Sequence, residues 1–251
     1  MKCFEKINQV NFQNNKKSIF LFPYAGGGTS SFIKWKNYFE DISLYVAQFP
    51  GRENKLSQQA LVSLEEILDF AFESIIEKIS TGETYYMFCH SLGTKIVYEL
   101  TLKIMASGLP RPKGIIISAG KAPIYKEENP ISHLDDENFI KEINRFSGTP
   151  EALIKNIDVM KLFLPVLRAD FLIDESYVRT SVEKIDVPIL ALMGTEDNEL
   201  TLEQLLRWKE YTSESFEFEY IEGGHMFVNT NAESVVFNIK KFLEKYNVEN
   251  I

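Results

Sequence analysis

The segment Cys89-His90-Ser91-Leu92-Gly93 has residue types and spacing that suit nucleophilic catalysis by a serine. An apolar run leads into it and a helical pattern follows directly, which predicts a sharp turn from a strand into a helix at Ser91. Such a turn presents the serine hydroxyl at the end of the strand, next to the free backbone amides at the start of the helix. The alternative is a strand–helix junction whose serine is incidental.

Cysteine occupies one of the two small-residue positions in this segment. Strand and helix nearly touch at such a turn, so the usual pattern, G-x-S-x-G, has glycine on both sides of the serine. Gly93 satisfies one position, whereas Cys89 carries a Cβ atom at the other. We therefore expect the turn to be slightly looser or its strand slightly displaced. Because Cys89 ends the buried strand two residues earlier, Ser91 is the expected nucleophile.

A serine hydroxyl is a poor nucleophile unless a neighbouring base takes its proton, and the sequence contains three histidines. His90 is next to the serine, and at such a turn its side chain points away from the hydroxyl, as a packing or turn residue. His133 lies in a helical region and is more typical of a surface or capping residue. His225 follows an apolar run and a Glu-Gly-Gly loop, and it precedes the last helix. In hydrolases with this turn the chain order is Ser, acid, His, with the histidine after the last strand, so His225 is the expected base.

The acid that orients this histidine should lie on the loop after the preceding strand. An apolar run there is followed by Gly-Thr-Glu-Asp-Asn-Glu, which contains Glu196, Asp197 and Glu199. We choose Asp197 to hold the tautomer of His225 and to stabilise the imidazolium ion formed during catalysis. Spacing alone does not select one carboxylate, so Glu196 and Glu199 stay open as alternatives. Asp197 could instead cap a helix that starts near Thr201.

A glycine-rich segment, Phe-Pro-Tyr-Ala-Gly-Gly-Gly-Thr at 22–29, follows the first strong apolar run. One interpretation is a phosphate-binding loop, but the G-K-[ST] ending of a P-loop is missing, and Ser31 stands where a dinucleotide motif would need a third glycine. Beside a nucleophile turn, such a loop can instead supply a backbone N–H group to an oxyanion hole, with the second N–H from Leu92. Losing one such donor typically costs about 3–4 kcal/mol of transition-state stabilisation.

The elements that must position these residues alternate between apolar runs and helical patterns. Continuous apolar runs suit strands buried on both faces, as in a parallel sheet, and they occur at 18–22, 44–48, 85–89, 114–118, 189–193 and 216–221. Helical patterns fall between and after them, at 64–76, from 92 to about 106, and at 235–246. This alternation predicts an α/β fold: a mostly parallel, doubly wound sheet with helices on both faces.

One region, from about 123 to 182, contains no convincing buried strand. Helical stretches are predicted at 136–146 and from 150 to about 170, with breaks at Gly148-Thr149-Pro150 and at Pro165. A helical segment of this length between two strands is an insertion on the sheet, and at the carboxyl edge of the strands it would form a lid. With no internal repeat and no shift in composition, the sequence predicts one domain over 1–251.

Composition limits the class of protein. The chain has 251 residues, 45% of them hydrophobic and 25% charged, which is typical of a globular protein and excludes collagen-like or disordered chains. Its two cysteines form no CxxC motif or Cys/His cluster, which fits a reducing compartment and argues against a zinc site.

No apolar run could span a bilayer and the N-terminus has no secretory signal, so we expect a cytoplasmic protein without a membrane partner. The net charge of −9, without a basic stripe, argues against nucleic acid as a partner, and a monomer is the default expectation.

Taken together, these residues resemble the type II thioesterases, the stand-alone α/β-hydrolases of nonribosomal peptide and polyketide assembly lines. The resemblance covers nearly the whole chain and rests on motifs that occur in order and at sensible spacing: FPYAGGG at 22–28 with Trp35 downstream, FPGRE at 49–53, CHSLG at 89–93, SAGKAP at 118–123, SHLDDENFI at 132–140, SGTPEAL at 147–153, LPVLRADF at 164–171 and GGHMF at 223–227. The family pattern at the nucleophile resembles G-H-S-M-G, so Cys89 is a departure that bears on the geometry of the turn.

The resemblance implies a catalytic triad of Ser91, Asp197 and His225, with the backbone amides of Ala25 and Leu92 as oxyanion donors. It also implies that the insertion at about 123–182 is a mobile lid that shapes an acyl pocket. The implied activity is hydrolysis of acyl thioesters on the phosphopantetheine arm of acyl or peptidyl carrier proteins, which removes stalled or wrong acyl groups. The enzyme needs no cofactor or metal of its own, because the partner protein carries the phosphopantetheine.

Two other functions are compatible with the sequence. A general small-ester hydrolase or an acyltransferase would use the same chemistry on another substrate. A non-catalytic protein would use the pocket to hold a carrier or a small ligand. Cys89 favours this function, because a cysteine in place of the usual glycine indicates that the sequence of the turn is less constrained.

Overall fold

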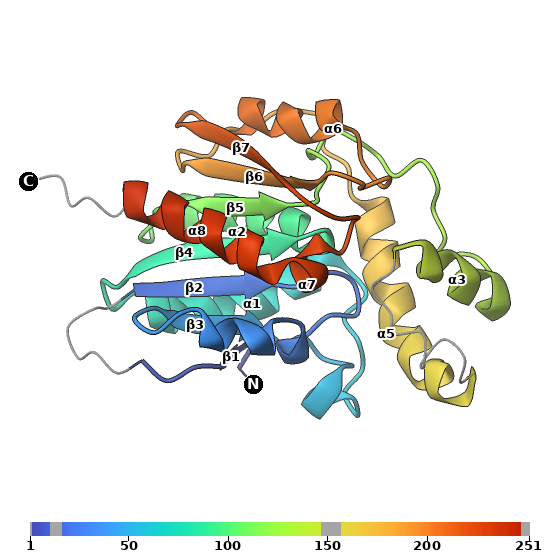
Figure 1. Cartoon of the computed structure of the whole chain (residues 1–251). Helices are drawn as coiled ribbons and strands as arrows, with labels where there is room; N and C mark the ends of the chain where they lie inside the picture. Colours follow the sequence, from blue (N-terminus) through green and yellow to red (C-terminus); the bar gives the residue numbers. More distant parts are fainter. Residues whose placement is uncertain (1, 11–16, 147–156, 247–251) are drawn as a thin grey trace, which may run out of the picture.

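The computed structural model describes residues 2–10, 17–146 and 157–246, which form a seven-stranded sheet with helices on both faces (Figure 1). The strands lie in the order β1-β3-β2-β4-β5-β6-β7. Neighbouring strands are parallel, except that β1 pairs antiparallel with β3. Their bounds are β1 Phe4–Lys6, β2 Lys17–Phe22, β3 Ser43–Ala47, β4 Thr84–His90, β5 Ile115–Ser118, β6 Ile189–Gly194 and β7 Phe216–Ile221. The predicted mostly parallel, doubly wound sheet is confirmed.

The central strands are buried on both faces, which explains their unbroken apolar sequences. Every residue of β6 is buried, and so is every residue of β4 after Thr84. Each of the six predicted runs corresponds to a strand whose ends lie within one residue of the prediction. Strand β1 was not predicted, because its three residues are too short for a periodic pattern and include two charged side chains.

Two layers of helices cover the sheet. One face carries α1 (Leu64–Ile79), α2 (Leu92–Ala106), α6 (Leu202–Leu206) and the 3₁₀ turn η4 (Arg207–Tyr211). The other face carries the 3₁₀ helix η1 (Thr29–Asn37), α7 (Phe227–Thr230) and α8 (Ala232–Tyr246). In Figure 1, α8 crosses in front of the sheet while α1 and α2 lie behind it. No helix within the described ranges is long and apolar enough to cross a bilayer.

Helix α1 shows how local sequence sets these elements. It begins after Ser63, whose hydroxyl accepts the Glu66 N–H while the Glu66 carboxylate accepts the Ser63 N–H, a reciprocal cap that satisfies two free amides. Its buried stripe recurs at helical spacing and consists of Ile67, Ala71, Ile75 and Ile79. The predicted helix is therefore confirmed, and it continues for three residues beyond the predicted stripe.

Between β5 and β6 the chain leaves the sheet and forms the predicted insertion. Its described elements are α3 (Asp136–Ile143), the 3₁₀ turn η3 (Asn144–Phe146) and α5 (Ile157–Ser176). In Figure 1, α3 and α5 lie beyond the carboxyl ends of the strands. They share a small core of their own, the insertion cluster, made of Ile131, Phe139, Ile143, Met160, Leu164 and Leu167.

Two predictions about the insertion need correction. The sequence predicts a break at Pro165 and an end near 170, but Pro165 lies inside α5, which runs to Ser176. Proline removes one helical hydrogen bond, while Leu164 and Leu167 beside it are buried in the insertion cluster. The free energy gained by packing these leucines outweighs the cost of the hydrogen bond that Pro165 removes. The predicted helical residues 150–156 and the Gly148-Thr149-Pro150 break lie outside the described residues.

Candidate active site

Ser91 lies at the turn between β4 and α2 in a strained backbone conformation. Its φ and ψ angles are 53° and −119°, in a region that costs a non-glycine residue about 1–3 kcal/mol. The turn is held from both sides: the Ser91 N–H donates to the Ser118 carbonyl (2.9 Å), and Thr94 donates to the Ser91 carbonyl through its N–H (2.9 Å) and its hydroxyl (2.7 Å). Ser91 is thereby fixed at the carboxyl end of a central strand, where it lines a cavity.

The two small-residue positions beside Ser91 differ in what they require. A Cβ atom on Gly93 would lie 2.5 Å from the backbone oxygen of Phe22 in β2, so glycine is needed there. Cys89 is completely buried, pairs in regular register with β2 and β5, and donates its thiol to the Ile116 carbonyl (S···O 3.2 Å). Burial raises the pKa of this thiol well above 9.0. The strand therefore keeps its regular register with Cys89 in place, and the sheet accommodates the sulfur.

Ser91, His225 and Asp197 form a chain of hydrogen bonds. Ser91 Oγ lies 3.1 Å from His225 Nε2, and His225 Nδ1 lies 3.0 Å and 3.1 Å from the two carboxylate oxygens of Asp197. Asp197 stands on the loop after β6 and His225 on the loop after β7, both at the carboxyl edge of the sheet. With Nδ1–H donating to the carboxylate, Nε2 is free to accept the serine proton.

The geometry selects Asp197 from the three candidate carboxylates. Its side chain is fully buried, and one oxygen also accepts the backbone N–H of Glu199 (2.9 Å), which fixes its direction. Glu196 is exposed, and the Glu199 carboxylate pairs with Arg145 (3.4 Å) at the wall of the cavity. Thr201 caps α6 with its own hydroxyl, so Asp197 does not serve as that cap.

The other two histidines take no part in the hydrogen bonds that link Ser91, His225 and Asp197. His133 is exposed on the insertion. His90 is completely buried against His225, with ring centroids 5.5 Å apart, and its Nδ1 lies 2.8 Å from Ser118 Oγ. Burial lowers the pKa of His90 well below 6.5, and the nearby His225 adds to this. The ring is therefore neutral at pH 7 and packs against the base without adding charge.

Two backbone amides near Ser91 have no hydrogen-bond acceptor among the described residues. Ala25 and Leu92 line the same cavity as Ser91, and within the described chain neither N–H donates a hydrogen bond. Leu92 is the first residue of α2, where the amides have no partner inside the helix. Ala25 lies in a turn after β2 that closes with the Gly27 N–H donating to the Tyr24 carbonyl (2.9 Å). Unsatisfied donors of this kind suit an oxyanion.

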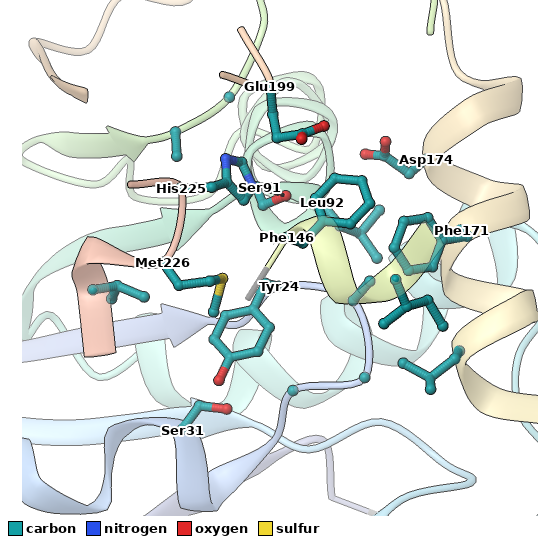
Figure 2. A pocket seen from close by; sticks show the side chains of 18 of the residues that line it. Tyr24, Ser31, Ser91, Leu92, Phe146, Phe171, Asp174, Glu199, His225 and Met226 are labelled. Carbon is teal, nitrogen blue, oxygen red and sulfur yellow. Dashed lines mark hydrogen bonds between the residues drawn. The ribbon is translucent and has the colours of Figure 1, made fainter. Parts of the chain in front are cut away.

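Ser91 opens into a cavity of about 600 Å³ between the sheet edge and the insertion. Figure 2 shows the rings of Phe146 and Phe171 on the side of Ser91 that faces α5, and the Phe146 ring centroid lies 5.8 Å from that of His225. Apolar residues of the insertion form this wall: Phe146, Met160, Phe163, Leu167 and Phe171. Charged residues also line the cavity, and Lys95 pairs there with Asp174 and Lys121 with Glu127.

The sequence predicted a lid here, and its motif at 164–171 contains Leu167 and Phe171, but it did not indicate which residues face the cavity. Which face of a helix looks onto a cavity depends on how the insertion docks, and that is not encoded in local spacing. Among the described residues, no three His, Cys, Asp or Glu side chains lie together in a group that could hold a metal ion.

Comparison with known proteins settles the family. Residues 17–243 match the family model described as the thioesterase domain. The chain belongs to the thioesterase family. The gramicidin S biosynthesis protein GrsT of Aneurinibacillus migulanus is 33% identical over 229 residues, which covers 90% of this chain and 89% of GrsT. The thioesterase PikA5 of Streptomyces venezuelae is 28% identical over 231 residues, covering 92% and 82% of the two chains.

Solved structures of thioesterases share the fold. YbtT, a type II thioesterase from the yersiniabactin NRPS/PKS pathway, superposes with a TM-score of 0.88 at 28% identity and covers 97% of this chain and 99% of its own. RedJ, a thioesterase of the prodiginine pathway in Streptomyces coelicolor, gives a TM-score of 0.83 at 26% identity, covering 90% and 85%. The predicted α/β-hydrolase fold and the predicted family, a serine hydrolase acting on thioesters, are confirmed.

Proposed function

We propose that this protein is an editing enzyme that hydrolyses acyl groups from the phosphopantetheine arm of carrier proteins in nonribosomal peptide or polyketide synthesis. The observation that carries the proposal is the Ser91–His225–Asp197 chain, which opens into a cavity with an apolar wall in a member of the thioesterase family. The pathways of the similar proteins support the substrate class, since YbtT is a type II thioesterase of a yersiniabactin NRPS/PKS pathway.

In the first step, His225 Nε2 removes the proton of Ser91 while the serine oxygen attacks the thioester carbonyl carbon. Asp197 stabilises the imidazolium ion that forms. Negative charge that develops on the carbonyl oxygen meets the N–H groups of Ala25 and Leu92. The tetrahedral intermediate then collapses: the C–S bond breaks, the imidazolium gives its proton to the departing sulfur, and an acyl group remains on Ser91.

In the second step, His225 takes a proton from a water molecule whose oxygen attacks the acyl carbonyl. The same two amides stabilise the second oxyanion. The bond to the Ser91 oxygen breaks and that oxygen regains a proton from the imidazolium. The products are a free acid and a carrier with a free pantetheine thiol, and the enzyme contributes only its own side chains, its backbone amides and water.

The proposed partner is a carrier protein that stays outside the cavity while its arm delivers the acyl group. Every group that the mechanism uses comes from one chain, which supports action as a monomer. Cys3 and Cys89 are both free thiols, as expected in a reducing compartment, and this supports a cytoplasmic location.

The first experiment measures hydrolysis of an acyl-carrier protein by variants at the proposed triad. We expect Ser91→Ala to abolish turnover, whereas Ser107→Ala, at the other end of α2, should match the wild type. Asp197→Asn leaves the shape of the side chain but favours the wrong imidazole tautomer, so kcat should fall about 10⁴-fold. Glu196→Gln, on the same loop, serves as its control. Unchanged turnover by Ser91→Ala would end the nucleophile assignment.

The second experiment separates the three candidate functions. The wild-type enzyme is compared on an acyl-carrier protein, a free acyl-pantetheine and a simple aryl ester. A preference for the acyl-carrier supports editing, whereas a strong preference for the aryl ester indicates a general esterase. Labelling of Ser91 by a fluorophosphonate probe is expected in both cases, and its absence would indicate a non-catalytic binding protein.

A further inference from the structure

We propose that Asp170, on α5 of the insertion, is a positioning residue for the oxyanion hole, and that Arg52 orients its carboxylate for this task. The proposal rests on the proposed function, because it concerns the oxyanion of that reaction. Asp170, on α5, and Arg52, in the loop after β3, form a buried ion pair, and neither step of the proposed mechanism uses them.

The ion pair has a fixed geometry. Arg52 Nη1 donates to Asp170 Oδ2 (2.8 Å) and Arg52 Nη2 donates to Asp170 Oδ1 (2.9 Å). The two side chains are only 4% and 1% exposed. Two parallel hydrogen bonds between planar groups allow one relative orientation. The direction in which the carboxylate faces the rest of the protein is therefore determined by Arg52.

Both partners also contact the turn that carries Ala25. The Gly26 N–H donates to Asp170 Oδ2 (2.7 Å), and Arg52 Nη1 donates to the Gly27 carbonyl (3.1 Å). A third contact comes from α5 itself, since a Cβ atom on Gly26 would lie 2.5 Å from Leu167 Cδ2. The turn is thus in direct contact with a helix of the insertion.

The hydrogen bond to Gly26 selects the conformation of this turn. Gly26 has a φ of +75° and Ala25 has no positive φ, which together describe a type II turn from Tyr24 to Gly27. Rotation of the peptide between Ala25 and Gly26 would give the type I form, in which the Ala25 carbonyl would replace the Gly26 N–H in front of Asp170. A buried carboxylate accepts the N–H and repels the carbonyl oxygen. Asp170 therefore fixes the peptide that follows Ala25, which limits how the backbone carrying the proposed Ala25 donor can move.

Stability alone gives a weak reason for this ion pair. Burying two charges carries a large desolvation cost, and apolar pairs of similar size are often equally stable. Arg52 Nε has no hydrogen-bond partner within the described chain, which adds to that cost. What an apolar pair could not provide is an acceptor for the Gly26 N–H, and this contact is the one that reaches the proposed oxyanion hole.

The test removes both charges together with Arg52→Met/Asp170→Leu, which leaves no unpaired buried charge. Removing a whole oxyanion donor costs about 10²–10³ in kcat, so a misplaced donor should cost about 10–100-fold, with KM nearly unchanged. Each measured rate is divided by the concentration of active sites, which is determined by titration with a fluorophosphonate, so that inactive protein does not lower kcat. We expect the affinity for an alkylboronic acid, which accepts the Ser91 oxygen and becomes a tetrahedral anion, to fall by a similar factor.

The matched control is Arg168→Met/Asp136→Leu. This pair also joins α5 to another part of the chain (2.7 Å) but contacts neither the turn nor the cavity. It should leave kcat, KM and boronate affinity at wild-type values. If the Arg52/Asp170 double variant does not fold, the isosteric Asp170→Asn is measured in the same way. It keeps an oxygen but loses the charge, so we expect a smaller fall in kcat of about three- to tenfold.

Three results would overturn the proposal: wild-type kcat per titrated site, a rise in KM at unchanged kcat, or a fall in kcat without a fall in boronate affinity. A purely structural ion pair would lower only the melting temperature and the number of titratable sites. Boronate binding requires no turnover, so it tests Asp170 even if the wild-type enzyme hydrolyses neither an acyl-carrier nor an aryl ester, which is the result that would contradict the proposed function.

Discussion

The thiol of Cys89 shows that the nucleophile turn tolerates a side chain where glycine is usual. It is buried in the sheet and its hydrogen bond goes to the Ile116 carbonyl of β5. The close approach that forbids a Cβ atom occurs at Gly93 instead. The two small-residue positions of the motif are therefore not equivalent in this chain.

We expect Cys89→Gly to keep kcat/KM for an acyl-carrier at or slightly above the wild-type value, because the thiol bonds to β5 and not to the triad. The free energy of unfolding should fall by about 1–3 kcal/mol, since a buried side chain is lost and glycine is more flexible in the unfolded chain. Urea unfolding and steady-state kinetics measure the two effects. Complete loss of hydrolysis in a folded variant would give the sulfur a catalytic role.

The sequence predicts some residues of the candidate site and not others. Ser91 follows β4 directly, and Asp197 and His225 lie on the short loops after β6 and β7, so recognising the strands placed their side chains at one edge of the sheet. Asp170 and Arg52 are 118 positions apart, and although they lie in the motifs at 164–171 and 49–53, neither motif indicates that the two side chains pair. Their pairing depends on how α5 docks, which only the folded chain shows.

The end of β2 and the start of α2 approach each other closely at the site. A Cβ atom on Gly93 would lie 2.5 Å from the Phe22 carbonyl oxygen and 3.0 Å from the Pro23 carbonyl oxygen. These are backbone atoms of the strand and the loop that lead into the proposed oxyanion turn, so they cannot move aside without shifting that turn.

We therefore predict that Gly93→Ala lowers the free energy of unfolding by about 1–3 kcal/mol or more through overpacking. The folded fraction should also lose most of its activity, because α2 carries the Leu92 amide and must move. Gly224→Ala is the control, since its nearest contact would be an ordinary 3.8 Å. Thermal unfolding and titration of active sites test both variants. A fully active, equally stable Gly93→Ala would show that the turn is looser than described.

The elements also show where sequence patterns reach their limit. Buried parallel strands were predictable because their apolar runs are set by burial on both faces, a property of the run itself. Strand β1 depends on an edge partner, and the continuation of α5 through Pro165 depends on the insertion cluster. Both are decided by tertiary contacts that outweigh local propensity.

For the molecule as a whole, buried His90 makes stability depend on pH. Its pKa in the folded state is lowered well below 6.5 by burial. Below about pH 6.5 the unfolded chain therefore binds a proton that the folded chain does not. The free energy of unfolding should then fall as the pH falls, by up to about 1.4 kcal/mol per pH unit from this group.

Urea unfolding between pH 7 and pH 5 measures this slope. We expect His90→Gln to make it shallower, whatever its effect on absolute stability, because the group that takes up the proton is gone. His133→Gln, at an exposed position, should leave the slope as it is. Equal slopes for the wild type and His90→Gln would contradict the expectation.

The Arg52–Asp170 pair has a consequence for engineering. One partner belongs to the α/β body and the other to the insertion, so the insertion is not an exchangeable module. A chimera that received its insertion from another thioesterase would keep Arg52. Unless the graft supplied a carboxylate at the same place, an uncompensated buried guanidinium would cost about 3–5 kcal/mol. Residues 49–53 and α5 should therefore be transplanted as one cassette.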